Sequence, residues 1–255
     1  MDHAFNVDIS DISLLPDNLK FDERKFSAFL QEEIPEKNQN GRKVLDGKKI
    51  EDSWFKPMEA DFFISHKHED EEKAKQLGAY LHSKEKSVFI DSCIWGDIKK
   101  LQTKIDNDYC LNDKKTFYYY GLRNKSTSYT HMLLANALLK TIVNCKNFVF
   151  LNTSNSIKAE NIITDTSETN SPWLYFEINV ANALLLEKIN AITESRENFS
   201  SMPEMSFEAD LKKFEKVNVE DFLIKCGFEK TEDWNSENDV SWRNLDETNN
   251  NLRHI

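Results

Sequence analysis

Three short apolar runs, each separated from the next by a helical pattern, constrain the fold of this chain more than any other feature. The runs are Phe62–Ile64, Val88–Ile90 and Phe148–Leu151. Runs of this length are typical of parallel strands that are buried on both faces. The residues between them place apolar side chains at helical spacing, as residues 70–83 do. The sequence therefore predicts an α/β domain with a parallel sheet and helices on both faces.

The same patterns divide the chain into three parts. Residues 59–195 carry the alternating strands and helices, with a loop insertion expected near 108–125 and a fourth strand expected at 189–193. Residues 1–58 are polar and charged, and we expect them to form an extension that packs on this core. Residues 196–255 are acidic and polar, and we expect them to form a second extension.

Two helix boundaries can be predicted from single residues. Ser126 or Ser128 suits the N-cap of the helix that follows the insertion. In the C-terminal extension, the apolar residues from Phe222 to Cys226 are followed by Gly227, which predicts one short helix that ends there.

Composition limits the partners and the compartment. The 255 residues carry a formal net charge of −11, so non-specific binding to nucleic acid is not expected. No apolar run is long enough to span a membrane, and the first residues do not resemble a signal peptide. The spacing of the four cysteines fits neither a zinc site nor a disulfide framework, which favours a reducing compartment. We therefore expect a cytoplasmic protein that binds neither a membrane nor nucleic acid.

Glu177 has a position that folding alone does not explain. Ser171 and Pro172 suit the N-cap and first turn of a helix, which places Glu177 in the second turn. The apolar residues on the same helical face are Trp173, Val180, Ala181 and Leu184. A carboxylate in an apolar stripe is costly to bury without a partner. The pattern leaves two interpretations open, a glutamate at the edge of the stripe paired with a lysine and a functional carboxylate.

Other polar and aromatic residues follow the predicted strands, where parallel sheets bind ligands. His66 and His68 lie two residues apart, so they are either zinc ligands on one side of an extended segment or members of a solvated loop. Trp95 and the aromatic run 117–120 either stack on a ligand ring or pack a loop onto the core. The segment Asn152–Ser154 follows the third strand and is expected at the same edge.

Two of these motifs resemble those of one known family. The stretch from Asp61 to Asp70, DFFISHKHED, resembles the opening of TIR (Toll/interleukin-1 receptor) domains, in which a strand ending in Phe-Ile-Ser precedes an acidic helix start. Ser171–Trp173 followed by Glu177 resembles the Ser-x-Trp-x-x-x-Glu pattern that carries the catalytic glutamate of TIR enzymes.

The segments between these motifs also agree with the family in order and spacing. Val88–Asp91 is similar to the second strand of TIR domains, and Phe148–Asn152 is similar to the third. Cys93–Gly96 is similar to a bacterial subgroup of TIR-like proteins associated with phage defence, including the Thoeris type. The family's loop with arginine, aspartate and a Pro-Gly turn after the second strand is absent here.

The resemblance implies a TIR-like (flavodoxin-like) fold and an enzyme that cleaves the nicotinamide–ribose bond of NAD⁺. It implies that NAD⁺ is a substrate, with no cofactor and no metal, and that Glu177 is catalytic. The residues that it places on the wall of the substrate pocket are Ser65, His66, Asp91, Trp95 and Trp173.

Products and partners follow from the same resemblance. The ribosyl cation would meet water, the adenine of the same molecule or another base, and so give ADP-ribose, a cyclic ADP-ribose isomer or a base-exchanged conjugate. Self-association of TIR domains on activation is expected, as is a downstream effector that responds to the product. Two alternatives remain open, a non-catalytic TIR adaptor that acts by assembly and an enzyme of related fold that processes other nucleotides.

Overall fold

A computed structural model of the chain describes residues 1–228 except 11, 17–18, 23–33, 41, 158, 162–165 and 186–206. The side chains of residues 94–97, and therefore that of Trp95, also lie outside the described part. The fourth strand predicted at 189–193 falls on residues that the structure does not describe.

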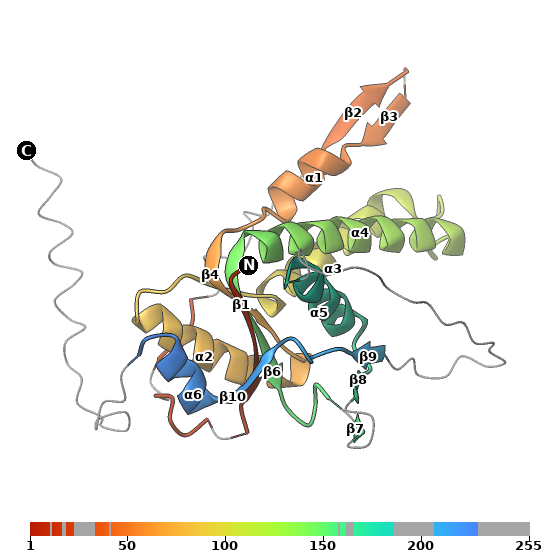
Figure 1. The fold of residues 1–255 in the computed structure, drawn as a ribbon. Coiled ribbons are helices and arrows are strands. Elements are labelled where there is room, and N and C mark those ends of the chain that lie inside the picture. Colours follow the sequence, from red (N-terminus) through yellow and green to blue (C-terminus); the bar gives the residue numbers. More distant parts are fainter. Residues whose placement is uncertain are drawn as a thin grey trace, which may run out of the picture.

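A parallel five-stranded sheet forms the centre of the fold (Figure 1). Its spatial order is β10-β1-β6-β4-β5, and every neighbouring pair is parallel. The strands are β1 (His3–Asp8), β4 (Ala60–Ser65), β5 (Val88–Ile90), β6 (Cys145–Asn152) and β10 (Glu215–Asn218). The three strands predicted from apolar runs are β4, β5 and β6, so these predictions are confirmed.

The fourth and fifth places of the sheet are filled from the two ends of the chain. A flavodoxin-like sheet has the order 2-1-3-4-5, and β5, β4 and β6 occupy the first three of these places. β1, from the N-terminal segment 1–58, lies beside β6, and β10, from the C-terminal segment 196–255, lies beside β1. The two segments expected as extensions therefore each supply a strand to the sheet.

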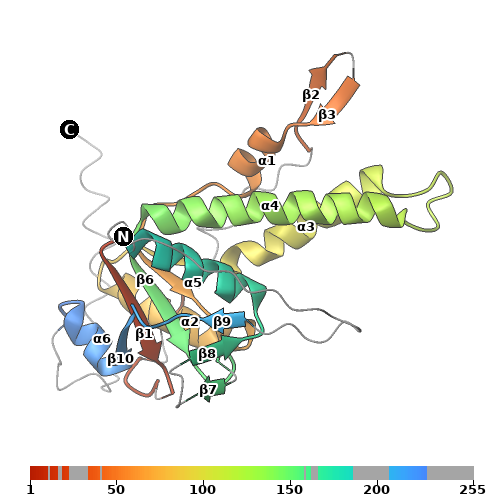
Figure 2. The same ribbon diagram turned by 45° about the vertical axis from the view of Figure 1, so that its right-hand side comes forward.

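Helices cover both faces of the sheet, as predicted (Figures 1 and 2). One face packs against α2 (Glu71–Ser83) and α6 (Val219–Lys225), through residues such as Leu77 and Phe222. The helices on the other face are α1 (Gly47–Trp54), α3 (Ser92–Tyr109), α4 (Tyr120–Asn144) and α5 (Pro172–Leu185). There the rings of Phe63 and Phe148 stack with centroids 5.5 Å apart. The predicted short C-terminal helix is α6, and Gly227 follows it with a φ of 84°.

The insertion predicted at 108–125 is shorter than expected, because α4 begins at Tyr120 and not after Ser126 or Ser128. Ser126 lies inside the helix, where its hydroxyl donates to the buried carboxylate of Asp106 on α3. Arg123 donates to the same carboxylate at 3.1 Å. These contacts stabilise the first turns of α4, whose sequence shows no helical periodicity. α3 and α4 thus form a hairpin whose closed end extends beyond the sheet (Figure 2).

The smaller elements lie around this core. The β2–β3 hairpin (Glu36–Gln39 and Arg42–Leu45) precedes α1, and the short helix η2 (His68–Asp70) precedes α2. The strands β7 (Ala159–Asn161), β8 (Thr166–Thr169) and β9 (Phe207–Ala209) form a separate antiparallel sheet. In the part of the chain that the structure describes, no helix has the length and hydrophobicity needed to cross a membrane.

Candidate functional site

The candidate site lies where β4 and β5 end and α5 begins. Ser65 is the last residue of β4, and Asp91 directly follows β5. Trp173 comes from the first turn of α5. Together these elements border a cleft of about 240 Å³. Its lining residues are His66, Lys67, His68, Asp91, Ser92, Lys99, Ser171 and Trp173. The cleft therefore lies at the carboxyl edge of the parallel sheet, where ligands of such sheets bind.

Glu177 is fully buried beside the end of β4. Its exposed fraction is 0%, and the hydroxyl of Ser65 donates a 2.6 Å hydrogen bond to its Oε2. Oε1 has no hydrogen-bond partner, and no cation pairs with the carboxyl, among the residues that the structure describes. The prediction that a lysine pairs with Glu177 at the edge of the apolar stripe is therefore wrong for the described residues.

Burial changes the protonation of Glu177. Loss of water around the carboxyl raises its pKa well above the usual 4.5, and the charge of Asp91 raises the pKa further. The hydrogen bond from Ser65 acts in the opposite direction, because it stabilises the ionised form. Glu177 therefore keeps its proton to a higher pH than an ordinary glutamate.

His66 and Asp91 form a buried pair on the wall of the cleft. Nδ1 of His66 lies 2.7 Å from Oδ1 of Asp91, and the two residues are 4% and 3% exposed. At this distance the two groups form an ion pair when the imidazole is protonated. Nε2 of His66 has no hydrogen-bond partner among the described residues. One nitrogen of a buried imidazole beside the cleft thus lacks a partner in the described part of the chain.

Asp91 also controls the charge of His66. Burial lowers the pKa of the imidazole and is the largest single effect. The charge of Asp91, its direct contact with the ring, and the smaller contributions of Glu71 and Asp70 together outweigh it. The net result is a pKa above the usual 6.5. His66 therefore carries a positive charge over a wider pH range than an ordinary histidine.

The two histidines of the first motif do not share one environment. The side chain of His66 is 1% exposed, whereas that of His68 is 81% exposed and contacts Glu71 at 3.4 Å. Among the described residues, no group of three or more histidine, cysteine, aspartate and glutamate side chains could hold a metal ion. The separation of the two imidazoles argues against the interpretation of His66 and His68 as a pair of zinc ligands.

The structure brings together most of the residues predicted for the site. His66, Asp91 and Trp173 line the cleft. Ser65 and Glu177 lie next to it but are 0% exposed and do not form its wall. Trp95 lies in α3, and its side chain is outside the described part of the chain.

Five lining residues were missed by the sequence analysis. They are Lys67, His68, Ser92, Lys99 and Ser171, although His68 and Ser171 had been considered for other roles. Lys99 follows Ser92 by seven residues, which is two helical turns, so both lie on one side of α3. That spacing was a usable signal once the helix start was known.

The segment Asn152–Ser154 lies at the expected edge but has a structural role. Thr153 donates a 2.6 Å hydrogen bond from its hydroxyl to Asp70, and Asn155 donates to the other oxygen of that carboxylate at 3.0 Å. Asp70 is 2% exposed. These bonds attach the loop after β6 to the start of α2, so this loop holds the cleft in shape without lining it.

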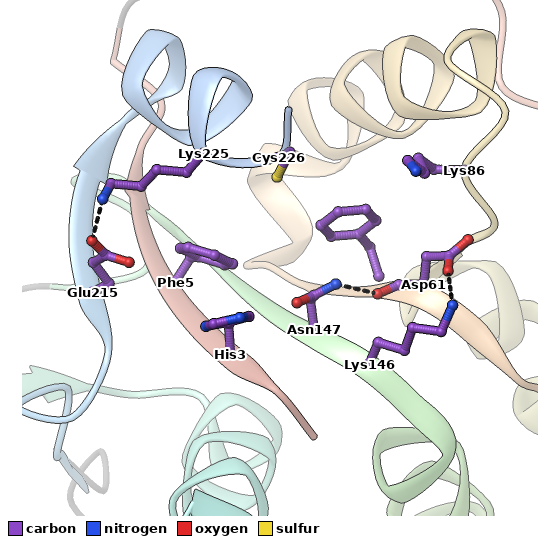
Figure 3. A pocket seen from close by; sticks show the side chains of 10 residues that line it. His3, Phe5, Asp61, Lys86, Lys146, Asn147, Glu215, Lys225 and Cys226 are labelled. Carbon is purple, nitrogen blue, oxygen red and sulfur yellow. Dashed lines mark hydrogen bonds and ion pairs between the residues drawn. The ribbon is translucent and has the colours of Figure 1, made fainter. Parts of the chain in front are cut away.

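A larger hollow of about 480 Å³ lies at the opposite, amino-terminal edge of the sheet (Figure 3). Phe5 and Phe62 are among its lining residues, and its two carboxylates are each paired with a lysine. The pairs are Lys146–Asp61 at 2.7 Å and Lys225–Glu215 at 2.6 Å. No fully buried ionisable group lines this hollow, so the smaller cleft beside Glu177 is the better candidate for chemistry.

The chemical capacity of the site follows from its charges. A buried carboxyl lies beside a cleft that holds one His–Asp pair and several cations, which suits a ligand with both a cationic and an anionic part.

Comparison with known proteins adds no family to this description. No protein-family model, no curated protein and no solved structure matched the chain.

Proposed function

We propose that this protein is a TIR-like enzyme that cleaves the nicotinamide–ribose bond of NAD⁺. The observation that carries the proposal is the 2.6 Å contact between Ser65 and Glu177, which joins the two motifs of the resemblance across 112 residues of sequence. The cleft beside this contact is lined by three of the other residues expected to bind substrate, His66, Asp91 and Trp173.

The chemistry requires one negative charge at the reacting ribose. The cationic nicotinamide leaves with the electron pair of the glycosidic bond, and the positive charge moves to the ribose. A carboxylate held at that point stabilises the oxocarbenium-like transition state more than the ground state. Water, the adenine of the same molecule or another base then adds to the cation. Water and adenine afterwards lose a proton to the solvent, whereas a pyridine-type base has none to lose and gives a cationic conjugate.

The raised pKa of Glu177 fits a site that becomes active with substrate. Burial and the charge of Asp91 hold the carboxyl in its protonated form. A cationic nicotinamide ring placed beside Glu177 would lower the pKa again, because an opposite charge favours the ionised form. Substrate binding would therefore generate the carboxylate that the reaction needs. The proposal places this activity in the bacterial cytoplasm and, by its TIR-like character, in defence against phage.

The test measures nicotinamide release by the purified full chain. NAD⁺ is supplied alone and together with a lysate of phage-infected cells, and Glu177→Gln is compared with the parent. Loss of one preorganised charge should lower the release rate by roughly 100- to 1,000-fold. Glu51→Gln is the matched control, because Glu51 is also a buried glutamate, 6% exposed, but lies on α1 outside the cleft.

Two outcomes would contradict the proposal. Equal rates for Glu177→Gln and the parent would remove the catalytic role of Glu177. No nicotinamide release by the parent in either condition would favour a binding module in place of an enzyme.

A specific observation supports the binding module as the second candidate. The loop between α3 and α4 and the first half of α4 expose large apolar side chains, among them Phe117, Tyr120, Tyr129 and Met132 at 55% to 81%. Exposed large aromatic side chains are frequent at surfaces that contact another protein. A binding module would release no nicotinamide but would lose its self-association in sedimentation when Tyr120 and Tyr129 are both changed to Ser. An assembling enzyme would show release that rises with protein concentration.

A further inference from the structure

The cleft is basic although the chain as a whole is acidic. The chain has a formal net charge of −11, yet the described residues that line the cleft include two lysines and two histidines. Asp91 is the single acidic residue among them, and it is paired with His66. Lys67 and Lys99 have no ion-pair partner in the described part of the chain. A positive potential therefore remains in the cleft, and anions are attracted to it.

The start of α3 adds backbone donors to the same place. This helix of 18 residues begins at Ser92, and its preceding residue, Asp91, makes no side-chain hydrogen bond to the first turn. The first backbone N–H groups of a helix lack partners within the helix, and they carry a partial positive charge. Helix starts of this kind bind phosphate groups.

Buried side chains at the cleft provide the second, independent observation. His66 is 4% exposed and lines the cleft, and its Nε2 lacks a hydrogen-bond partner among the described residues. The hydroxyl oxygen of Ser92 is likewise buried and unpartnered in that part of the chain. Buried polar atoms are nearly always paired in folded proteins. Two such atoms at one cleft indicate that a ligand supplies the missing acceptor.

We infer that this cleft is a diphosphate-binding subsite, in which Lys67, Lys99 and the N-terminus of α3 hold the phosphate oxygens. The identity of the ligand as NAD⁺ rests on the proposed function, but the anion binding itself does not require cleavage. A cleft of about 240 Å³ is smaller than the roughly 300–1,000 Å³ typical of sites for whole drug-sized ligands. It therefore takes the central part of a dinucleotide and leaves the adenosine outside.

The arrangement of the cations supports a diphosphate over a carboxylate. Lys67 comes from the turn after β4, and Lys99 comes from the third turn of α3, so the two approach the cleft from different elements. Two cations and a set of backbone donors match the several oxygens of a diphosphate, whereas one carboxylate would leave most of them unused.

The experiment titrates the full chain with inorganic pyrophosphate, ADP-ribose and adenosine by calorimetry at low ionic strength. Lys99→Gln and Lys67→Gln are compared with Lys104→Gln, which removes the same charge from the same helix. Lys104 lies outside the cleft, in a neighbouring hollow that Lys99 also lines, so the comparison tests which of the two hollows holds the anion. Melting curves establish that each variant is folded.

We expect pyrophosphate and ADP-ribose to bind and adenosine not to bind. Loss of a charged donor should raise the Kd for pyrophosphate and for ADP-ribose by about tenfold, both in Lys99→Gln and in Lys67→Gln. Lys104→Gln should change affinity less than twofold. Binding of pyrophosphate but not ADP-ribose would identify a site for the free anion and overturn the dinucleotide assignment. Equal effects of Lys99→Gln and Lys104→Gln, or adenosine binding as strong as ADP-ribose binding, would overturn the subsite.

The same variants separate this inference from the proposed function. Anion binding that depends on Lys99, with no release of nicotinamide, would support the subsite and contradict the enzyme. Nicotinamide release whose KM is unchanged by Lys99→Gln would support the enzyme and contradict the subsite.

Discussion

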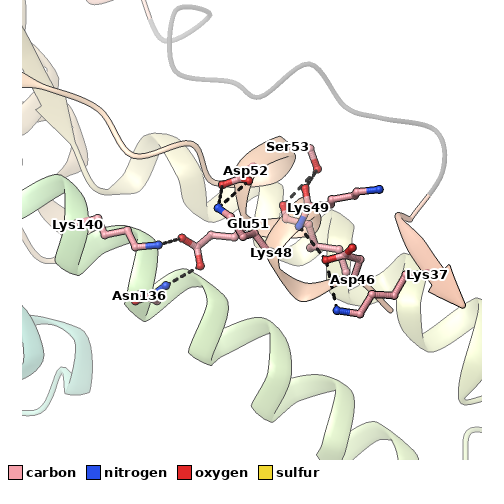
Figure 4. A network of polar contacts seen from close by, with 10 residues as sticks. Lys37, Asp46, Lys48, Lys49, Glu51, Asp52, Ser53, Asn136 and Lys140 are labelled. Carbon is pink, nitrogen blue, oxygen red and sulfur yellow. Dashed lines mark hydrogen bonds and ion pairs between the residues drawn. The ribbon is translucent and has the colours of Figure 1, made fainter. Parts of the chain in front are cut away.

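Two glutamates are buried in the part of the chain that the structure describes, and they differ in the partners of their carboxyl oxygens. Glu51 on α1 is 6% exposed, and Glu177 on α5 is 0% exposed. Both oxygens of Glu51 have partners from α4, since Asn136 donates to one at 2.6 Å and the ammonium of Lys140 donates to the other (Figure 4). Glu177 has the hydroxyl of Ser65 on one oxygen and, among the described residues, no partner on the other.

The difference separates a carboxylate that joins two helices from one that is held ready for chemistry. Glu51 is neutralised by a cation, so its burial fixes α1 on α4 and leaves no charge uncompensated. Glu177 faces the like charge of Asp91, which raises its pKa together with burial. Proteins place carboxyls in such unfavourable surroundings mainly at functional sites. A carboxyl with a missing partner is thus a better sign of function than burial alone.

The largest effect expected beyond Glu177 itself concerns its single hydrogen-bond partner. Ser65→Ala removes the donor that lowers the pKa of Glu177, so the pKa should rise further and less carboxylate should form. Nicotinamide release near neutral pH should fall by about 10- to 100-fold, the value of one hydrogen bond to a charged group. The acid limb of the pH–rate profile should move to higher pH. Asn136→Ala, which removes the equivalent donor from Glu51, should leave that profile in place.

A smaller effect is expected on stability, and its sign depends on pH. The folded chain binds the proton of Glu177 more tightly than the unfolded chain does, because the folded-state pKa lies well above 4.5. Below pH 4.5 both states are protonated. As pH rises from there to the folded pKa, only the unfolded state loses its proton, so the parent loses up to about 1.4 kcal/mol per pH unit from this group.

Melting curves of Glu177→Gln and the parent measure this loss. The Tm of the variant should exceed that of the parent by a few degrees near neutral pH, since about 1 kcal/mol corresponds to roughly 2–4 °C in a chain of this size. The gap should close as pH falls toward 4.5. His66 also has a raised pKa, but it is present in both proteins and cancels in the difference. A gap that grows as pH falls would mean that Glu177 is ionised and paired in the folded state.

The parts of the fold that were predictable are those set by local pattern. β4, β5 and β6 appear as apolar runs, and α2 and α5 appear in their periodicity or capping residues, so their positions were confirmed. The place of β1 could not be predicted, because its short sequence HAFNVD includes polar residues and its pairing with β6 is long-range. The start of α4 was missed for a similar reason, since the contacts of Arg123 and Ser126 with Asp106 on α3 stabilise it.

The candidate site also has a part that the sequence pattern predicted and a part that it could not predict. The position of Glu177 on an apolar helical face was visible in the sequence, and its burial in the structure agrees with that pattern. Its contact with Ser65 could not be derived from periodicity, because the two residues meet only when α5 packs beside the end of β4. Lys67 and Lys99 were invisible as site residues, because a lysine at a cleft and a lysine in solvent have the same sequence signal.

The smallest expected effect tests the other half of the comparison, the claim that Glu51 depends on its cation. The side chain of Lys140 is 44% exposed and that of Glu51 is 8% exposed, so water reaches one side of the pair. Lys140→Gln should therefore cost only about 0.2–1 kcal/mol, which lowers the Tm by roughly 1–4 °C. In 1 M salt the difference should shrink, because the screening length falls to about 3 Å.

Lys48→Gln is the control for this measurement, since Lys48 pairs with Asp52 on the exposed side of α1, with side chains 80% and 54% exposed. Its loss should change the Tm by less than that of Lys140, because exposed pairs contribute little. If Lys140→Gln melted like Lys48→Gln at low salt, Glu51 would be stable in its buried place without a cation. An unpaired buried glutamate would then be an ordinary structural feature of this fold, and the missing partner of Glu177 would no longer indicate a function. If Lys140→Gln alone is destabilised, and only at low salt, the cation is what allows Glu51 to be buried as a carboxylate. The lack of a paired cation at Glu177 would then still indicate a functional carboxyl.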